Sequence, residues 1–177
     1  MSRLPLLLLA VACASTGPRR PERYFVLETR AAAAAPFAVR VAPTTAARFY
    51  DTQDIAFSRS PGTRGFYQFN HFTERPQRIV QDALAARLER GGAGTGLLLR
   101  TNLDEIFHDA VQAPGAARIA LTAQLIDANG AVLATRRFST AAPAGSYDAE
   151  GAARAFAAAI DALADEVVAW IASQRGG

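Results

Sequence analysis

The fold of this chain is decided by residues 119–139, IALTAQLIDANGAVLATRRFS. Apolar residues stand at every second position from Ile119 to Leu125, which is the period of a strand with one buried face. Asn129-Gly130 then supplies the dipeptide that favours a tight turn between antiparallel strands. The stretch therefore predicts a β-hairpin whose second strand covers Ala131–Ser139.

Working outward, another strand precedes this hairpin, and the three form a meander. Its apolar residues Leu97, Leu99, Leu103 and Phe107 share one parity, so we expect them on one face of the sheet. Ser60-Pro61-Gly62-Thr63 predicts a turn between two earlier strands. The short strands expected before the meander are Tyr24–Leu27, Phe37–Val41, Ile55–Ser58 and Gly65–Phe69.

Two amphipathic helices complete the pattern. One begins at Pro76, a residue that suits the first turn of a helix, and stops at Gly91-Gly92. The other is capped by Asp148 and reaches about Ser173. Two helices on one face of an antiparallel or mixed sheet predict a single α+β domain over residues 24–175.

The N-terminus has the form of a secretory signal over residues 1–12: Arg3 is basic, an apolar run follows, and Ala12 is small. This run is far shorter than the roughly 20 residues of a membrane-spanning helix. The run ends at Cys13, and Ala10-Val11-Ala12-Cys13 resembles the lipobox of bacterial lipoproteins, in which the cysteine carries fatty acyl chains such as palmitate. We therefore expect lipidation at Cys13, against the alternative of an ordinary cleaved signal, and a tether over residues 13–23.

Composition and motifs argue against several classes of function. The chain has 19 basic residues, all arginine, against 16 acidic ones, a balance that is no signature of nucleic-acid binding. His71 and His108 are the only histidines, and no zinc-binding or metalloprotease spacing exists. The glycine-rich residues 91–96 lack the lysine of a phosphate-binding loop. We therefore expect no catalytic residues, no metal site and no cofactor.

Aromatic residues are concentrated between positions 49 and 72, where seven of the chain's fifteen lie. Their parity makes both faces of the strand near Tyr67 apolar, so one face needs a cover. Coverage within the monomer and a docking surface are equally good explanations. The candidate partner-docking residues are Tyr50, Phe57, Phe66, Tyr67, Phe69, Phe72 and Arg75.

The segments Tyr50–Gly62, Tyr67–Phe69 and Phe72–Pro76 resemble the ABC-type transport auxiliary lipoprotein family, which includes lipoproteins related to the paraquat-inducible C protein. The likeness extends from the strand at Phe25–Leu27 to the closing helix. Phe72 stands where many members have tryptophan. The resemblance implies a non-enzymatic adaptor in an envelope ABC transporter that moves lipids between membranes.

By this resemblance, the partners are a mammalian-cell-entry (MCE) domain subunit and the permease and ATPase of the transporter. Members face the periplasm from a membrane anchor, and Ala14 after Cys13 favours the outer membrane over the inner one. Two alternatives stay open: a periplasmic lipid-binding module with an acyl chain between sheet and helices, and a hydrolase built around His71 or His108. A homo-oligomer would also explain surplus apolar surface.

Overall fold

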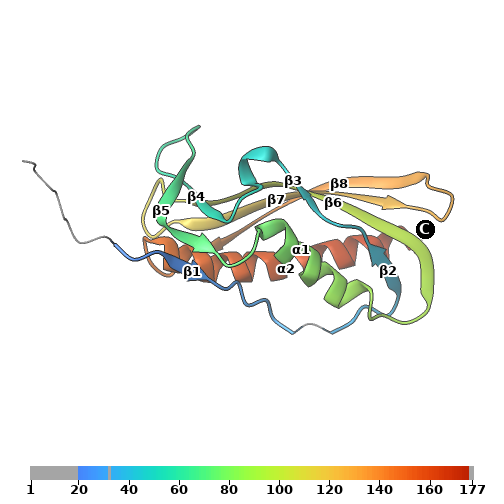
Figure 1. Ribbon diagram of the computed structural model, residues 1–177. Coiled ribbons are helices and arrows are strands. Elements are labelled where there is room, and N and C mark those ends of the chain that lie inside the picture. Colours follow the sequence, from blue (N-terminus) through green and yellow to red (C-terminus); the bar gives the residue numbers. More distant parts are fainter. Residues whose placement is uncertain (1–19, 32, 176–177) are drawn as a thin grey trace, which may run out of the picture.

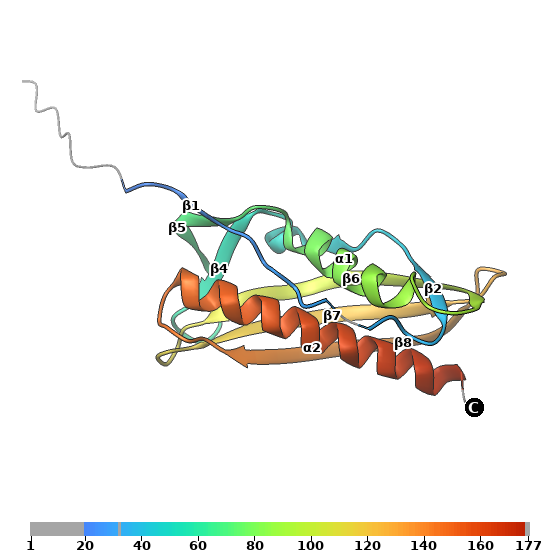
Figure 2. The ribbon, with the colours of Figure 1, turned by 90° about the horizontal axis from the view of Figure 1, so that it is seen from below.

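The computed structural model describes residues 20–31 and 33–175. One mixed sheet of eight strands carries two helices on a single face, and the opposite face, called the open face below, carries a short 3-10 turn (Figures 1 and 2). This arrangement confirms the predicted α+β class. The expected signal segment at 1–12 and the cysteine at position 13 lie outside the described residues.

A long central strand, β6 (Gly94–Asp109), organises the sheet. Three short strands pair with it in parallel, one after another along the same chain direction: β2 (Ala38–Val41), β3 (Thr45–Ala46) and β4 (Asp54–Ser58). On its other side β6 pairs antiparallel with β7 (Ala116–Ile126), which pairs antiparallel with β8 (Val132–Pro143), as the meander predicted. Beyond β4 lie β5 (Gly65–Phe72) and then β1 (Arg23–Phe25).

Both helices begin where local chemistry favours it. Pro76 opens α1 (Pro76–Leu88), and the Asp148 carboxylate accepts a hydrogen bond of 2.8 Å from the Gly151 N–H in the first turn of α2 (Ala149–Arg175). After α1, a Cβ placed on Gly91 would lie 2.1 Å from the carbonyl oxygen of Phe37, so only glycine permits this close approach of two backbones. Neither helix is long and apolar enough to cross a membrane, a finding that covers the described residues.

The core lies between the sheet and the helices. Its largest fully buried apolar side chains come from both layers. These side chains are Phe72, Phe156, Ile55, Leu84, Leu88, Leu99, Leu103, Ile119, Leu121, Leu125 and Ile160. Figure 2 shows α2 running along β7 and β8, the two strands that it contacts most.

One expectation for β6 is wrong. Leu103 pairs with Leu121 and faces the helices, but the register shifts before Glu105, so Ile106 and His108 take up that face and Phe107 turns to the open face. A β-bulge adds one residue to one strand and thereby exchanges the two faces beyond it. Odd positions in β6 therefore do not share one face along its full length.

A buried ion pair joins the helices. The Arg87 side chain of α1 is only 2% exposed, and its guanidinium lies 2.9 Å from Asp161 and 2.8 Å from Asp165 of α2. Its Nη1 also donates to the Ala83 carbonyl. Asp161 in turn accepts a hydrogen bond from the Arg30 backbone N–H, so the segment before β2 joins the same cluster.

Candidate functional site

The structure divides the seven candidate docking residues between the core and the surface. Phe72 is 1% exposed and packs edge-on against Phe156 of α2, with ring centroids 5.7 Å apart. Tyr50, in the turn η1 (Arg48–Tyr50), is 8% exposed. Both rings are almost completely covered within the monomer. They therefore contribute to its packing and leave little surface for a partner to contact.

A slip in register explains why Phe66 and Phe72 face opposite ways despite their equal parity. Asp54 pairs with His71, whereas Ala56 pairs with Phe66. Between these two pairs the chain advances by two residues in β4 but by five residues in β5, so β5 has three extra residues. The odd number of extra residues reverses the faces of β5 between these pairs. Phe66 therefore points to the open face, and Phe72 points to the helices.

Phe57 and Tyr67 lie on the helix side, where they cover a buried histidine. Their rings are 4.8 Å apart, and the Tyr67 hydroxyl lies 2.8 Å from Nδ1 of His108. The other ring nitrogen, Nε2, donates to the Pro114 carbonyl at 3.2 Å, so Nδ1 is the acceptor for Tyr67. Burial lowers the pKa of His108 despite the opposing effect of the Pro114 hydrogen bond, which keeps this ring neutral at neutral pH.

Within residues 49–72, the exposed aromatic surface consists of Phe49 and Phe66. Their rings stack with centroids 4.6 Å apart on the open face, and they are 42% and 38% exposed. Arg48, Thr52 and Asp54 complete the wall of a shallow depression of about 570 Å³ around them. We call these five residues the aromatic patch.

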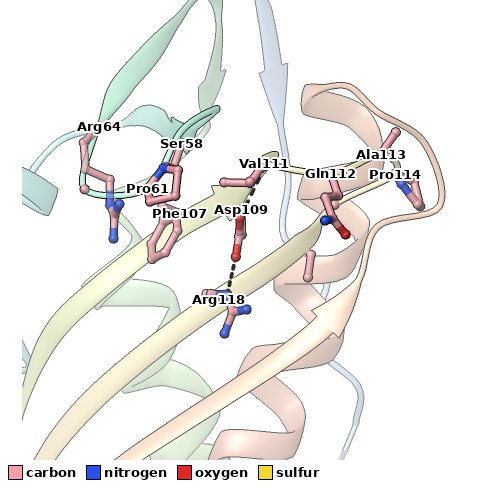
Figure 3. Close-up of a pocket in the computed structure, with 13 residues that line it drawn as sticks. Ser58, Pro61, Arg64, Phe107, Asp109, Val111, Gln112, Ala113, Pro114 and Arg118 are labelled. Carbon is pink, nitrogen blue, oxygen red and sulfur yellow. Dashed lines mark hydrogen bonds and ion pairs between the residues drawn. The ribbon is translucent and has the colours of Figure 1, made fainter.

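Arg64 lies between Tyr50 and a second pocket. Its Nε donates to the Tyr50 hydroxyl at 3.1 Å, and its guanidinium lies 3.5 Å from the centroid of the Phe107 ring. The pocket beyond it, of about 600 Å³, lies between the β4–β5 turn and the β6–β7 loop (Figure 3). Asp109 and Arg118 form an ion pair of 2.6 Å inside it.

This pocket is electrostatically balanced. Partial burial by itself raises the pKa of Asp109, but hydrogen bonds from the Arg118 side chain and the Val111 N–H outweigh it and hold the pKa below its usual value. Asp109 is therefore an anion at neutral pH and neutralises Arg118. Glu105 lies 3.8 Å from Arg64 and partly neutralises that guanidinium too.

The remaining two candidate docking residues, Phe69 and Arg75, are not members of the patch. Arg75 extends from the start of α1 to Asp51, which also accepts from Gln77 at 2.6 Å. Phe69 is half-buried in β5. The candidate residues thus do not form one surface, and Phe66 alone among them belongs to the aromatic patch.

Both histidines are hydrogen-bonded within the domain. His108 has both ring nitrogens engaged as described, and His71 pairs with Asp54 at 2.8 Å. No serine hydrogen bonds to either ring in the described part of the chain. Nor do three or more His, Cys, Asp or Glu side chains gather there in a group that could hold a metal ion.

Comparison with known families identifies the chain. Residues 26–168 match the family model of the ABC-type transport auxiliary lipoprotein component. The chain belongs to this family. As an auxiliary lipoprotein it has an accessory role in ABC transport and works in the cell envelope. The comparison with curated proteins gave no match.

Solved structures share the fold of this auxiliary lipoprotein. A crystal structure of a protein from Xanthomonas campestris superimposes with a TM-score of 0.75 at 23% sequence identity, covering 86% of this chain and 96% of that one. A second crystal structure, of an uncharacterized protein, has a TM-score of 0.70 at 11% identity, covering 86% and 99%. At these identities the likeness concerns the fold.

Sequence reasoning missed two features of the auxiliary lipoprotein's surface. Phe49 belongs to the aromatic concentration but is not among the seven predicted docking residues, although its position beside Tyr50 is a usable signal. Arg64 is not among the predicted docking residues, and nothing in its neighbours indicates that it stacks on Phe107, forty-three positions away, since this contact depends on the bulge in β6.

Proposed function

We propose that this auxiliary lipoprotein is a lipid-anchored, periplasm-facing adaptor of an envelope ABC transport system of the MCE type, which moves lipids between membranes. The observation that carries the proposal is the family match over residues 26–168. The MCE-domain subunit and the permease and ATPase are its proposed partners, and the protein itself acts without catalysis or cofactor.

Cys13 is the proposed site of lipidation, followed by a tether and by the domain at 24–175. The tether from Cys13 to the start of β1 at Arg23 spans at most ~35 Å when extended. It would hold the β1–β5 end of the sheet near the bilayer. Ala14, where aspartate would favour retention at the inner membrane, supports the outer membrane as the location.

The aromatic patch is the proposed docking surface for the transport complex. Phe49 and Phe66 expose stacked rings, with Arg48 and Asp54 at the rim, and aromatic residues ringed by polar groups are typical of interface hot spots. Of the residues expected from sequence to dock, we retain Phe66. Phe57, Tyr67, Phe69 and Arg75 remain neighbouring candidates.

Affinity purification from detergent-solubilised membranes tests the docking proposal. The unchanged protein should recover ATPase and MCE-domain subunits, and the Phe49→Ser, Phe66→Ser double variant should lose them while retaining its thermal stability. Val26→Ser is the control for loss of an exposed apolar side chain, because Val26 is 65% exposed and lines a different depression, between β1 and α2. If the double variant and Val26→Ser recover the complex equally, the patch is not the docking surface.

Cys13→Ala tests the anchor separately. The variant should appear in the soluble periplasmic fraction and lose incorporation of labelled palmitate, because no other cysteine exists in the chain. A variant that stays in the membrane fraction would contradict the anchor. A Cys13→Ser variant should behave identically, since oxygen does not replace the thiol in the lipobox reaction.

The lipid-binding alternative gains no support from the described residues. The space between sheet and helices, where an acyl chain would lie, is occupied by buried side chains such as Leu99, Phe156 and Ile160. Native mass spectrometry of the purified protein distinguishes the two functions. A stoichiometric phospholipid would favour the lipid-binding module over the adaptor.

A further inference from the structure

The outer edge of β8 is a free strand edge in the described part of the chain. β8 pairs with β7 along nearly its whole length, from Pro143 opposite Ala116 to Val132 opposite Ile126. It is the last strand of the sheet (Figure 1), and no described strand pairs with its other side. Such an edge presents N–H and C=O groups that another extended chain can complete.

The charge of this edge has one sign. Residues 128–147 contain no Asp or Glu and two adjacent arginines, Arg136 and Arg137, both exposed. Because neighbouring residues of a strand point to opposite faces, the edge presents one guanidinium on each face of the sheet. An extended partner would therefore meet positive charge above and below.

The two arginines differ in how far the protein already neutralises them. Arg137 lies 3.5 Å from Asp104 and 3.6 Å from Glu105 on the open face. Arg136 lies 4.9 Å from the Phe138 ring, on the helix face, and no described carboxylate is within ion-pair distance of it. Arg136 therefore has the greater capacity for a new anionic partner.

We propose that the outer edge of β8 binds an extended acidic segment of another protein by strand addition. Two consecutive acidic residues of that segment would lie opposite Arg136 and Arg137, one on each face. Val132 and Leu133, which are 52% and 56% exposed at the start of β8, would contact apolar residues at one end of it. About ten residues suffice, because ten strand residues span ~33 Å.

The same charges disfavour a second copy of this chain as the occupant. An antiparallel pair of β8 strands that overlaps over most of their length brings the four arginines of two copies to the middle of the new ladder. Like charges at such positions are destabilising. Positive side chains on an edge strand are a common means of preventing this self-association.

The experiment uses the full-length protein in detergent micelles and dye-labelled ten-residue peptides of alternating Thr and Val. One peptide has a central Asp-Glu pair, a second has Lys-Lys, and a third is the acidic peptide with every backbone amide N-methylated. At low salt, where charge is least screened, fluorescence anisotropy should show at least about tenfold tighter binding of the acidic peptide than of the basic one. N-methylation should abolish binding, since the ladder needs the N–H groups.

Two double variants provide the controls. Arg136→Glu with Arg137→Glu should reverse the preference, so that the basic peptide binds more tightly. Arg78→Glu with Arg90→Glu makes the same change in net charge at exposed positions in α1 and directly after it, away from β8, and should leave the affinities within about twofold. The acidic peptide should also slow amide hydrogen exchange in residues 132–143 of the unchanged protein.

Several results would overturn the proposal. These are equal affinity for the acidic and basic peptides, binding that survives N-methylation, an equal loss of binding in the Arg78/Arg90 control, or no binding of any peptide at millimolar concentration. A dimer of the protein cross-linked through β8 would likewise overturn it, because a second copy would then occupy the edge.

Discussion

Replacing Arg87 by methionine should destabilise the protein by about 3–5 kcal/mol. The substitution keeps most of the buried aliphatic volume, so it mainly removes the charge and its hydrogen bonds. Arg87 is 2% exposed and bonds to Asp161 at 2.9 Å, to Asp165 at 2.8 Å and to the Ala83 carbonyl at 3.0 Å. Without it, the Asp161 carboxylate is left in a site where its side chain is 11% exposed.

The cost should come from Asp161 far more than from Asp165. Asp161 retains only the Arg30 backbone N–H as a donor, and an unpaired buried charge is costly. Asp165 is 51% exposed and still pairs with the Arg30 side chain, so water screens the loss there. Adding Asp161→Asn to Arg87→Met should therefore recover at least about 1 kcal/mol relative to the sum of the single changes.

Urea unfolding followed by far-ultraviolet circular dichroism gives these free energies. For a domain of this size, 3–5 kcal/mol corresponds to a fall in Tm of about 6–20 °C. Arg78→Met is the matched control on the same helix, because Arg78 is 64% exposed, and it should cost less than about 0.5 kcal/mol. An Arg87→Met variant within 1 kcal/mol of the unchanged protein would refute the reasoning, since the pair would then contribute no net stability.

Three further changes test the core and its neighbours. Phe72→Ala should cost about 3–5 kcal/mol in urea unfolding, because it leaves a cavity beside Phe156, and a cost below 1 kcal/mol would contradict its place in the core. Gly91→Ala should reduce the free energy of unfolding by about 1–3 kcal/mol and so lower Tm by several degrees, because its Cβ would collide with the Phe37 carbonyl. An unchanged Tm would show that the two backbones separate freely. Because the pKa of His108 is lowered in the folded state, the unfolded chain binds more protons than the folded one as the pH falls below 6.5. The stability that the neutral, buried His108 contributes is therefore complete above pH 6.5 and is lost as the pH falls toward the folded-state pKa. Urea midpoints measured between pH 7.5 and 5 should fall less steeply for His108→Gln, and parallel curves for the two proteins would exclude the histidine as the cause.

The sequence predicted a strand, turn or helix start well where a single local pattern was enough to determine it. The alternation at 119–125 and the Asn129-Gly130 turn gave β7, β8 and their pairing, and Pro76 and Asp148 marked the starts of both helices. The 3-10 turn at Arg48–Tyr50 and the two-residue strand β3 were missed, because such short elements are stabilised by their neighbours and carry no period of their own.

The candidate site was less predictable than the fold. Aromatic density selected residues 49–72 as the candidate region, but parity could not say which rings face outward. The slip between β4 and β5 sends Phe72 into the core and leaves Phe66 on the open face beside Phe49. No pattern in the sequence near Arg64 indicates that its guanidinium stacks on the Phe107 ring.

By itself the sequence determined the α+β class, the order and type of the main elements and the family. These follow from spacings of a few residues, and the period of apolar side chains is a property of each segment taken alone. Only the tertiary structure decided which aromatic rings are exposed, that Arg87 is buried against Asp161, and that the edge of β8 is left open with two arginines on it. Each of these depends on register and on contacts between residues far apart in the chain, and a shift of one residue in register exchanges the two faces of a strand.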